Sequence, residues 1–322
     1  MPKPIVLLYE PFHDDGLALL DQKTEIRYAS SLDEECLLTE AADVDAIIIR
    51  ANGGVSPRLM EAAPRLKVIG RHGVGVEKID LVAAAERGIV VVNSPEANTE
   101  SVAEHCLGMM LVLAKWMRRA DKAARQGRWN VRYEYFGDEL YGKTLGLLGF
   151  GRIGQRVAQL CRRALDMSVL YYDIFEYPEA AGAVKARRVS LDELLAQSDV
   201  LSIHVPLLPS TQGLLGEAEL CLMKPGAYII NTARAAIVEE AALVRALRQG
   251  RLAGAGLDVF GEEPAPADNP FFALDNVIVT PHMAAHTQEA MRRMAKTVVT
   301  DVIAVLEGQQ PRYPVNVKEF SR

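Results

Sequence analysis

The sequence predicts an α/β protein with two doubly wound parallel β-sheets. Short apolar runs alternate with segments of helical spacing along most of the chain, a pattern typical of strand–helix–strand units. One set of these runs lies between Ile5 and Asn93, and a second set follows a glycine-rich turn at residues 149–154. At 322 residues, the chain is long enough for two domains of ordinary size, each with its own core.

The first domain is predicted from five short apolar runs. These strand candidates are Ile5–Tyr9, Glu25–Tyr28, Ala46–Ile49, Lys67–Gly70 and Ile89–Asn93. Segments of helical spacing separate them, such as 32–42 and 79–87. A long amphipathic helix is then expected from about Thr99 to Gln126, with Gly127 as its stop.

The second domain is predicted from a further series of strands that make one nucleotide-binding sheet of five or six strands. The candidates are Thr144–Leu148, Met167–Tyr172, Val200–Val205, Ala227–Asn231, Gly254–Val259 and Val277–Thr280. A last helix, Thr287–Leu306, lies beyond this sheet, and we expect it to pack back on the first domain. Residues 1–98 and 285–322 should therefore form one domain, with residues 99–284 inserted as the other.

Composition excludes several classes of function. The hydrophobic fraction of 49% and the charged fraction of 24% are those of a soluble globular protein. The net charge of -6, without a basic cluster, argues against a nucleic-acid partner. The four cysteines are scattered, no signal peptide opens the chain, and no apolar stretch reaches the length of a membrane span. We therefore expect a cytoplasmic protein that binds neither nucleic acid nor membrane.

The stretch Gly149-Phe-Gly-Arg-Ile-Gly154 is the most specific local signal, because it follows one predicted strand and opens a helix. Gly149 suits the tight turn, Gly151 lets a pyrophosphate approach the backbone, and Gly154 lets helix and strand pack closely. Nineteen residues after Gly154, the next strand ends on Asp173, a carboxylate placed for the adenosine ribose hydroxyls. Ile174 and Phe175 follow, so no arginine stands beside it in sequence to receive a 2′-phosphate. The motif predicts an NAD site.

Three strand-end residues in the second domain suit hydride transfer between a 2-hydroxy acid and NAD. They are Arg234, Glu263 and His282. A cation can hold the carboxylate and polarise the carbonyl, a histidine can carry the hydroxyl proton, and a carboxylate can orient the imidazole. Ligands of open α/β sheets bind outside the carboxyl ends of the strands, where all three should fall. No third ligand accompanies His282 and His286, so no metal site is expected.

The chain resembles the D-isomer-specific 2-hydroxyacid dehydrogenases, the family of D-3-phosphoglycerate, glyoxylate/hydroxypyruvate and D-lactate dehydrogenases. The resemblance runs from about Ala46 to Asn316. The motifs that carry it are Gly70-Arg-His-Gly-Val-Gly-Val76, Asn98-Thr-Glu-Ser-Val-Ala-Glu-His105, Leu145–Gly154, His204-Val-Pro-Leu207, Met223-Lys-Pro-Gly226, Asn231-Thr-Ala-Arg234, Glu263-Pro264 and Pro281-His282.

The resemblance implies a Rossmann NAD-binding domain inserted in a flavodoxin-like substrate domain, and homodimers formed through the long helix and the loop after it. It implies that Arg234, Glu263 and His282 are the catalytic residues and that Asp258 holds the nicotinamide amide. The further cofactor contacts that we expect are Arg152, Ile153, Pro206, Thr211 and Ala233. It also places a substrate loop after the third strand, Asn52-Gly53-Gly54, whose backbone N–H groups would bind the carboxylate.

Two readings of the substrate stay open. Phosphoglycerate-type relatives usually carry Ser/Thr and Lys where this chain has Asn52, Gly53 and Gly54, which argues against phosphoglycerate. Arg50 and Arg71, however, stand where that branch places cations for the distal phosphate. Either these two arginines bind a second anionic group of the substrate while Arg234 binds its carboxylate, or they are solvated arginines at strand ends.

An alternative of a different class is an NAD(H)-sensing interaction protein with a vestigial dehydrogenase site, as in the C-terminal-binding-protein corepressors. Against it, the sequence shows no disordered tail of the kind expected of an interaction hub. Formate dehydrogenase is a third alternative, but it usually carries a glutamine where this chain has Glu263. Turnover of any 2-keto acid separates the enzyme from the sensor.

Overall fold

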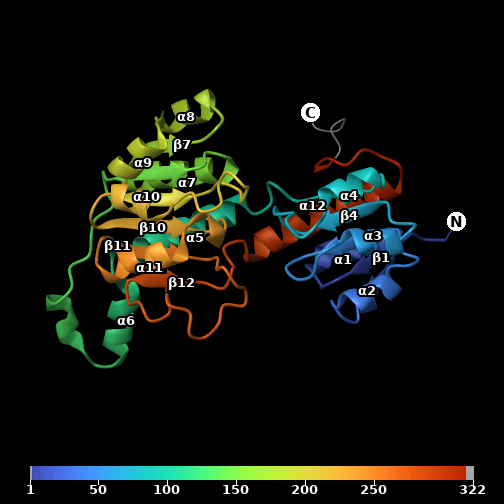
Figure 1. Ribbon diagram of the computed structural model, residues 1–322, viewed down its shortest axis with the longest axis horizontal. Helices are drawn as coiled ribbons and strands as arrows, with labels where there is room; N and C mark the ends of the chain where they lie inside the picture. The colour runs from blue at the N-terminus through green and yellow to red at the C-terminus, as the bar shows by residue number, and fades with distance from the viewer. Residues whose placement is uncertain (1, 317–322) are drawn as a thin grey trace. The chain divides into compact units, whose positions relative to one another are not determined.

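The computed structural model describes residues 2–316. These residues fall into two compact units, one built from the chain up to Asn98 and again from His286, the other from Thr99–Ala285 (Figure 1). Each unit contains one sheet, and all its strand pairs are parallel. The predicted fold class is confirmed.

The first unit has a five-stranded sheet in the order β2-β1-β3-β4-β5. Its strands are β1 (Ile5–Leu8), β2 (Glu25–Tyr28), β3 (Ala46–Ile49), β4 (Val68–Arg71) and β5 (Val90–Val92). Every residue of β1 and β3 is buried, as the continuous apolar runs of central parallel strands require. Because the order reverses between β1 and β3, the loops after these two strands diverge at the carboxyl edge of the sheet.

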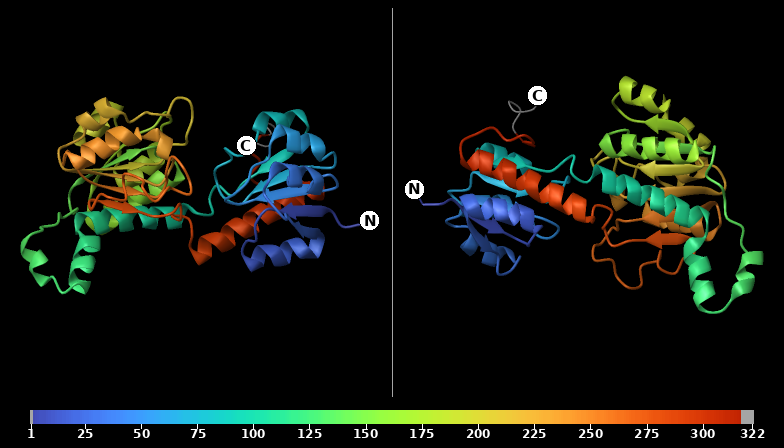
Figure 2. Two further views of the ribbon diagram at one scale, coloured as in Figure 1. Left: turned by 60° about the horizontal axis from the view of Figure 1, so that its bottom comes forward. Right: turned by 180° about the vertical axis from the view of Figure 1, so that it is seen from behind.

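Helices cover both faces of this sheet. They are α1 (Asp14–Lys23), α2 (Glu34–Glu40), α3 (Pro57–Ala62), α4 (Leu81–Glu86) and α12 (Gln288–Leu306). Figure 2 shows α12 lying along the sheet, where Val298 and Val302 join a core cluster with Leu8 and Ile48. The expectation that the last helix packs on the first unit is confirmed. The helices α2, α3 and α4 contribute to the core on the opposite face.

The second unit has a seven-stranded sheet in the order β12-β11-β10-β9-β6-β7-β8. Its strands are β6 (Thr144–Leu148), β7 (Ser168–Tyr172), β8 (Arg187–Arg188), β9 (Val200–Ile203), β10 (Ala227–Asn231), β11 (Leu252–Leu257) and β12 (Val277–Val279). The expected number of strands, five or six, was too low. The missed edge strand β8 consists of two exposed arginines, so it has no apolar run that could reveal it.

One face of this sheet is covered by α5 (Thr99–Ala114), α7 (Arg152–Leu165) and α8 (Pro178–Val184). The other is covered by α9 (Leu191–Gln197), α10 (Glu217–Leu222) and α11 (Glu240–Arg248). Two core clusters result, one on each side of the sheet. No helix within residues 2–316 is long and apolar enough to cross a membrane.

The predicted long helix from Thr99 to Gln126 is wrong in one respect, because two helices replace it. After α5 ends at Ala114, Trp116 adopts a left-handed conformation with φ 55°, and α6 (Met117–Arg125) begins after it. In this conformation the Trp116 ring stacks on Tyr135, with 5.1 Å between ring centroids, and under the guanidinium of Arg119. These contacts favour the break in a segment whose apolar spacing alone predicts continuity. The helix α6 and the 3-10 turn η1 (Trp129–Tyr133) project from the body of this unit (Figure 2).

Candidate active site

The glycine turn lies between β6 and α7 and has the packing that a dinucleotide site needs. Gly149 has φ +98°, and a Cβ there would lie 2.8 Å from the backbone of His204 and Val205. A Cβ on Gly154 would collide with the carbonyl oxygen of Gly149. At Gly151, by contrast, no atom lies within 4 Å of an added Cβ. The outer glycines are therefore required by packing, and the middle one leaves the N-terminus of α7 open to a phosphate group.

Asp173 follows β7 and holds the glycine turn in place. Its Oδ2 accepts a hydrogen bond from the Phe150 backbone N at 2.7 Å, and its Oδ1 accepts one from the Phe175 backbone N at 3.0 Å. An ionised carboxylate has about four acceptor sites, so these two bonds leave capacity for ribose hydroxyls. Both the turn and the carboxylate fit an NAD molecule.

Although no arginine is next to Asp173 in sequence, the structure brings one to it from a neighbouring strand. Arg188 on β8 donates from Nη2 to the Asp173 carbonyl oxygen at 2.9 Å, and its Nη1 bonds Glu176 at 2.5 Å. The contact arises because β7 and β8 pair in parallel, with Tyr171 opposite Arg188. The residues next to Asp173 in sequence give no sign of an arginine that a neighbouring strand supplies. Its charge is paired with Glu176.

Other expected cofactor contacts lie in turns that the structure braces. The Thr211 hydroxyl donates to the Pro206 carbonyl oxygen at 2.6 Å and so closes the loop after β9. The Ala233 backbone N donates to the Asn231 side chain at 3.0 Å. Arg152 and Ile153 occupy the first positions of α7.

The three expected catalytic residues follow three adjacent strands. Arg234 follows β10, Glu263 lies in the loop after β11, and His282 follows β12. His282 Nδ1 lies 2.7 Å from Glu263 Oε2, and Glu263 Oε1 accepts the Phe260 backbone N–H at 3.0 Å. The imidazole is half exposed, so the pair is held from one side and open to solvent on the other. Arg234 donates from Nη1 to the Ala233 carbonyl oxygen at 2.7 Å.

Asp258 organises the turn that carries His282. His282 has φ +50°, a left-handed conformation that costs a non-glycine residue about 1–3 kcal/mol and persists only where neighbouring contacts impose it. The buried Asp258 carboxylate accepts hydrogen bonds from the Thr280 hydroxyl at 2.6 Å, the Met283 N at 2.8 Å and the Ala284 N at 2.9 Å. It thus holds the chain on both sides of His282, a role distinct from the expected one on the nicotinamide amide.

His105 is a residue of this network to which sequence reasoning assigned no role. Its Nε2 lies 3.0 Å from the Thr280 hydroxyl. Because that hydroxyl donates its proton to Asp258, it accepts from His105. The available signal was a histidine next to the buried Cys106, on a helix whose buried residues are mostly apolar.

The expected substrate loop lies in the first unit, and the backbone N–H groups at its start already donate to a side chain. The Ala51 and Asn52 backbone N–H groups donate to Glu10 Oε2 at 2.7 and 3.0 Å. Gly53 has φ +72°, and a Cβ there would lie 2.7 Å from the Tyr9 ring. A Cβ on Gly54 would lie 2.7 Å from the Lys78 carbonyl oxygen. Packing alone therefore explains both glycines.

The two arginines in question differ in their surroundings. Arg71 donates to carbonyl oxygens of its own loop, from Nε to Gly75 at 2.8 Å and from Nη1 to His72 at 2.5 Å. Arg50 donates from Nη1 to the Pro11 carbonyl oxygen at 3.2 Å. Arg71 is thus used in closing the loop after β4, whereas Arg50 has one long backbone bond on its guanidinium and a sulfur contact at 3.6 Å.

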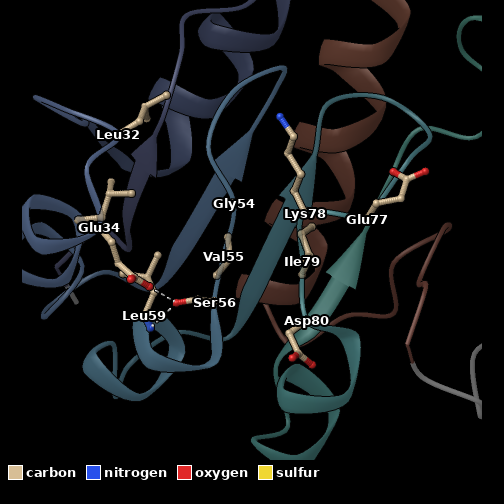
Figure 3. A pocket seen from close by; sticks show the side chains of 11 residues that line it. Leu32, Glu34, Gly54, Val55, Ser56, Leu59, Glu77, Lys78, Ile79 and Asp80 are labelled. Carbon is tan, nitrogen blue, oxygen red and sulfur yellow. Dashed lines mark hydrogen bonds between the residues drawn. The ribbon is translucent and has the colours of Figure 1, made fainter. Parts of the chain in front are cut away.

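A pocket of about 420 Å³ in the first unit lies between the loops that follow β3 and β4 (Figure 3). Its lining includes Gly54, Val55, Ser56 and Lys78 but not Arg50 or Arg71. The Ser56 hydroxyl already bonds Glu34 there, at 2.5 Å. The pocket does not bring the expected substrate-binding residues together.

The geometry agrees with comparisons with known proteins. The sequence model described as "D-isomer specific 2-hydroxyacid dehydrogenase, NAD binding domain" matches residues 107–284. The glyoxylate reductase of Thermofilum pendens is 40% identical over 324 residues, which cover 98% of this chain and 95% of that protein. The chain belongs to the D-isomer specific 2-hydroxyacid dehydrogenase family. Within that family, residues 107–284 are the NAD-binding domain.

Other members of the family extend the comparison. The D-3-phosphoglycerate dehydrogenase of Archaeoglobus fulgidus is 41% identical over 313 residues, which cover 97% of this chain. The chain spans only 59% of the length of that relative. The crystal structure of the TT0316 protein from Thermus thermophilus has a TM-score of 0.89 and 38% identity, covering 97% of this chain and 99% of that one.

Proposed function

We propose that the chain interconverts a small D-2-hydroxy acid and its 2-keto acid with NAD. The observation that carries the proposal is the pair of His282 and Glu263, whose Nδ1 and Oε2 atoms are 2.7 Å apart. The pair stands at the carboxyl edge of the sheet that also carries the glycine turn and Asp173. The glyoxylate reductase and D-3-phosphoglycerate dehydrogenase named among the relatives support a substrate of this class.

The roles of the residues follow from this geometry. Because Glu263 takes the proton on His282 Nδ1, the other ring nitrogen, Nε2, is the one that moves a proton to or from the substrate oxygen. The Glu263 carboxylate also stabilises the imidazolium. Arg234 would bind the substrate carboxylate and polarise the carbonyl, and losing such a donor costs about 3–4 kcal/mol in comparable enzymes. NAD, when bound, supplies or accepts the hydride.

Turnover tests the proposal. Loss of NADH absorbance is followed with glyoxylate, pyruvate, hydroxypyruvate, 3-phosphohydroxypyruvate, 3-sulfopyruvate and 2-ketoglutarate. We expect reduction of at least one keto acid, and abolished turnover with retained NADH binding in His282→Ala. Tight NADH binding without turnover of any member would contradict the proposal and favour the NAD-sensing alternative.

We also propose that the protein is a homodimer in the cytosol, with the contact at α6 and the segment after it. Five aromatic side chains are exposed there: Trp129, Tyr133, Tyr135, Phe136 and Tyr141. An exposed apolar patch of this kind is typical of a protein–protein interface. Phe136→Glu should yield monomers in sedimentation velocity, while Tyr28→Glu, at an exposed aromatic of the first unit, should leave the dimer intact. An unaltered dimer in Phe136→Glu would place the contact elsewhere.

A further inference from the structure

Glu10 lies where the strand order of the first unit reverses. It comes two residues after the end of β1, and Ala51 and Asn52 come two and three residues after the end of the neighbouring strand β3. In open parallel sheets, the carboxyl edge at such a reversal is the usual ligand-binding place. The chain therefore puts one of its own carboxylates where a ligand is expected.

The contacts of Glu10 are those of a bound anion. Its Oε2 accepts two consecutive backbone N–H groups, from Ala51 at 2.7 Å and Asn52 at 3.0 Å, and its Oε1 accepts the Asn52 side-chain amide at 2.9 Å. Successive N–H groups of this kind bind carboxylate and phosphate oxygens in many proteins. From the other side, Lys78 Nζ donates to the Ala51 carbonyl oxygen at 2.8 Å. The anion-binding groups at the start of this loop are thus satisfied internally.

Charge strengthens this arrangement. Burial acts to raise the pKa of Glu10, but the hydrogen bonds from Asn52 and Ala51 and the positive charge of Arg50 outweigh it, so the pKa is lowered. Glu10 is therefore anionic at neutral pH. Its negative charge interacts with the positive charge of Arg50, the residue that would bind a second anionic group of the substrate.

We propose that Glu10 is a specificity-determining residue that makes the chain select 2-keto acids with a single anionic group. A phosphate or second carboxylate that approaches Arg50 would meet the Glu10 carboxylate, which holds the adjacent N–H donors. Two anions cannot share these donors without mutual repulsion or displacement of one of them. This inference rests on the proposed function and favours the reading in which Arg50 does not bind a second substrate anion.

Glu10→Gln tests the charge with little change of shape. The glutamine oxygen can take the two backbone N–H groups, and its amide can face Asn52, whose own amide can turn to present its oxygen. The comparison uses hydroxypyruvate and 3-phosphohydroxypyruvate, which differ only in the phosphate. We expect the ratio of their kcat/KM values to shift toward the phosphorylated substrate by about tenfold, as removing one nearby charge implies, through a lower KM.

Matched controls separate charge from loop structure. Glu40→Gln changes another carboxylate of the same unit, one that accepts the Ser30 backbone N at 3.2 Å, and it should leave the ratio unchanged. Glu10→Asp keeps the charge and should keep the wild-type ratio. In the absence of substrate, calorimetric titration with inorganic phosphate should show tighter binding to Glu10→Gln than to the wild type.

The outcomes are distinct. An unchanged substrate ratio and unchanged phosphate binding in Glu10→Gln would overturn the role of Glu10. A wild type that already prefers the phosphorylated substrate would overturn it as well. If the wild type reduces no keto acid of the full panel, the proposed function fails. In that case, or if it reduces only other members of the panel, the phosphate titration alone decides whether Glu10 excludes a second anion.

Discussion

Replacing His72 should remove an acid-sensitive part of the stability of the first unit. The imidazole follows β4, is only 3% exposed, and stacks on the Phe12 ring with 5.6 Å between centroids. Its Nε2 has no hydrogen-bond partner among residues 2–316. Burial first, and then the positive charges of Arg50 and Arg71, lower the pKa of His72 from 6.5 to about 4.

The sign and size of the effect follow from this difference. In the folded protein His72 stays neutral down to about pH 4, whereas the unfolded chain binds a proton below about pH 6.5. Stability is therefore present above pH 6.5 and is lost as the pH falls toward 4. With one pKa unit worth about 1.4 kcal/mol, the fall between about pH 7 and pH 5 comes to roughly 2 kcal/mol.

The assay is urea unfolding followed by circular dichroism at several pH values. The neutral variant His72→Asn loses some packing against Phe12 at pH 7, but its stability should fall less on acidification than that of the wild type, by about 2 kcal/mol. His13→Asn is the control, because asparagine keeps the N-cap of α1 that His13 provides. Parallel losses of stability in the wild type and His72→Asn would refute the reasoning.

Three further predictions concern the second unit. Gly154→Ala should lower NADH affinity at least about tenfold and destabilise the fold by about 1–3 kcal/mol, because the added Cβ would collide with the Gly149 carbonyl oxygen. Calorimetry measures the affinity and urea unfolding the stability, and wild-type values of both quantities would contradict the packing argument. Asp173→Ala should reduce the preference for NADH over NADPH in steady-state kinetics, and an unchanged preference would place the discrimination elsewhere. Asp258→Asn replaces an acceptor oxygen by an N–H donor beside the backbone N–H groups that follow His282. The turn that carries His282 should then be displaced, so kcat should fall about 10- to 100-fold while NADH affinity changes less. An unchanged kcat would show that the turn does not depend on this carboxylate.

The fold could be predicted because each central strand is a continuous apolar run between residues that break it. The run of Ala46–Ile49 has the same limits in the sequence and in the structure, and so does Thr144–Leu148. Periodicity could not show that Trp116 interrupts the helix, since the cause is a stacking partner nineteen positions away, Tyr135. Local pattern captures burial, but not the contacts that residues far apart in sequence make.

In the candidate site, too, some residues could be predicted from local sequence and others could not. Glycine spacing and strand-end positions were sufficient to select Gly149, Asp173 and His282. Arg188 and Glu10, in contrast, reach their partners only because particular strands pair side by side, and nothing in their own neighbourhoods marks them. The contacts of Arg188 with Asp173 and of Glu10 with Ala51 and Asn52 therefore depend on strand pairing between segments far apart in sequence.

The break at Trp116 has a practical consequence. The chain has two tryptophans, Trp116 and Trp129, and both lie at the segment that projects from the second unit. Trp116 contacts both the Tyr135 ring and the Arg119 guanidinium, whereas Trp129 is 68% exposed. Intrinsic fluorescence therefore reports on this segment rather than on either sheet. The emission maximum of these tryptophans, measured across a dilution series, would therefore test the proposed dimer contact without a label.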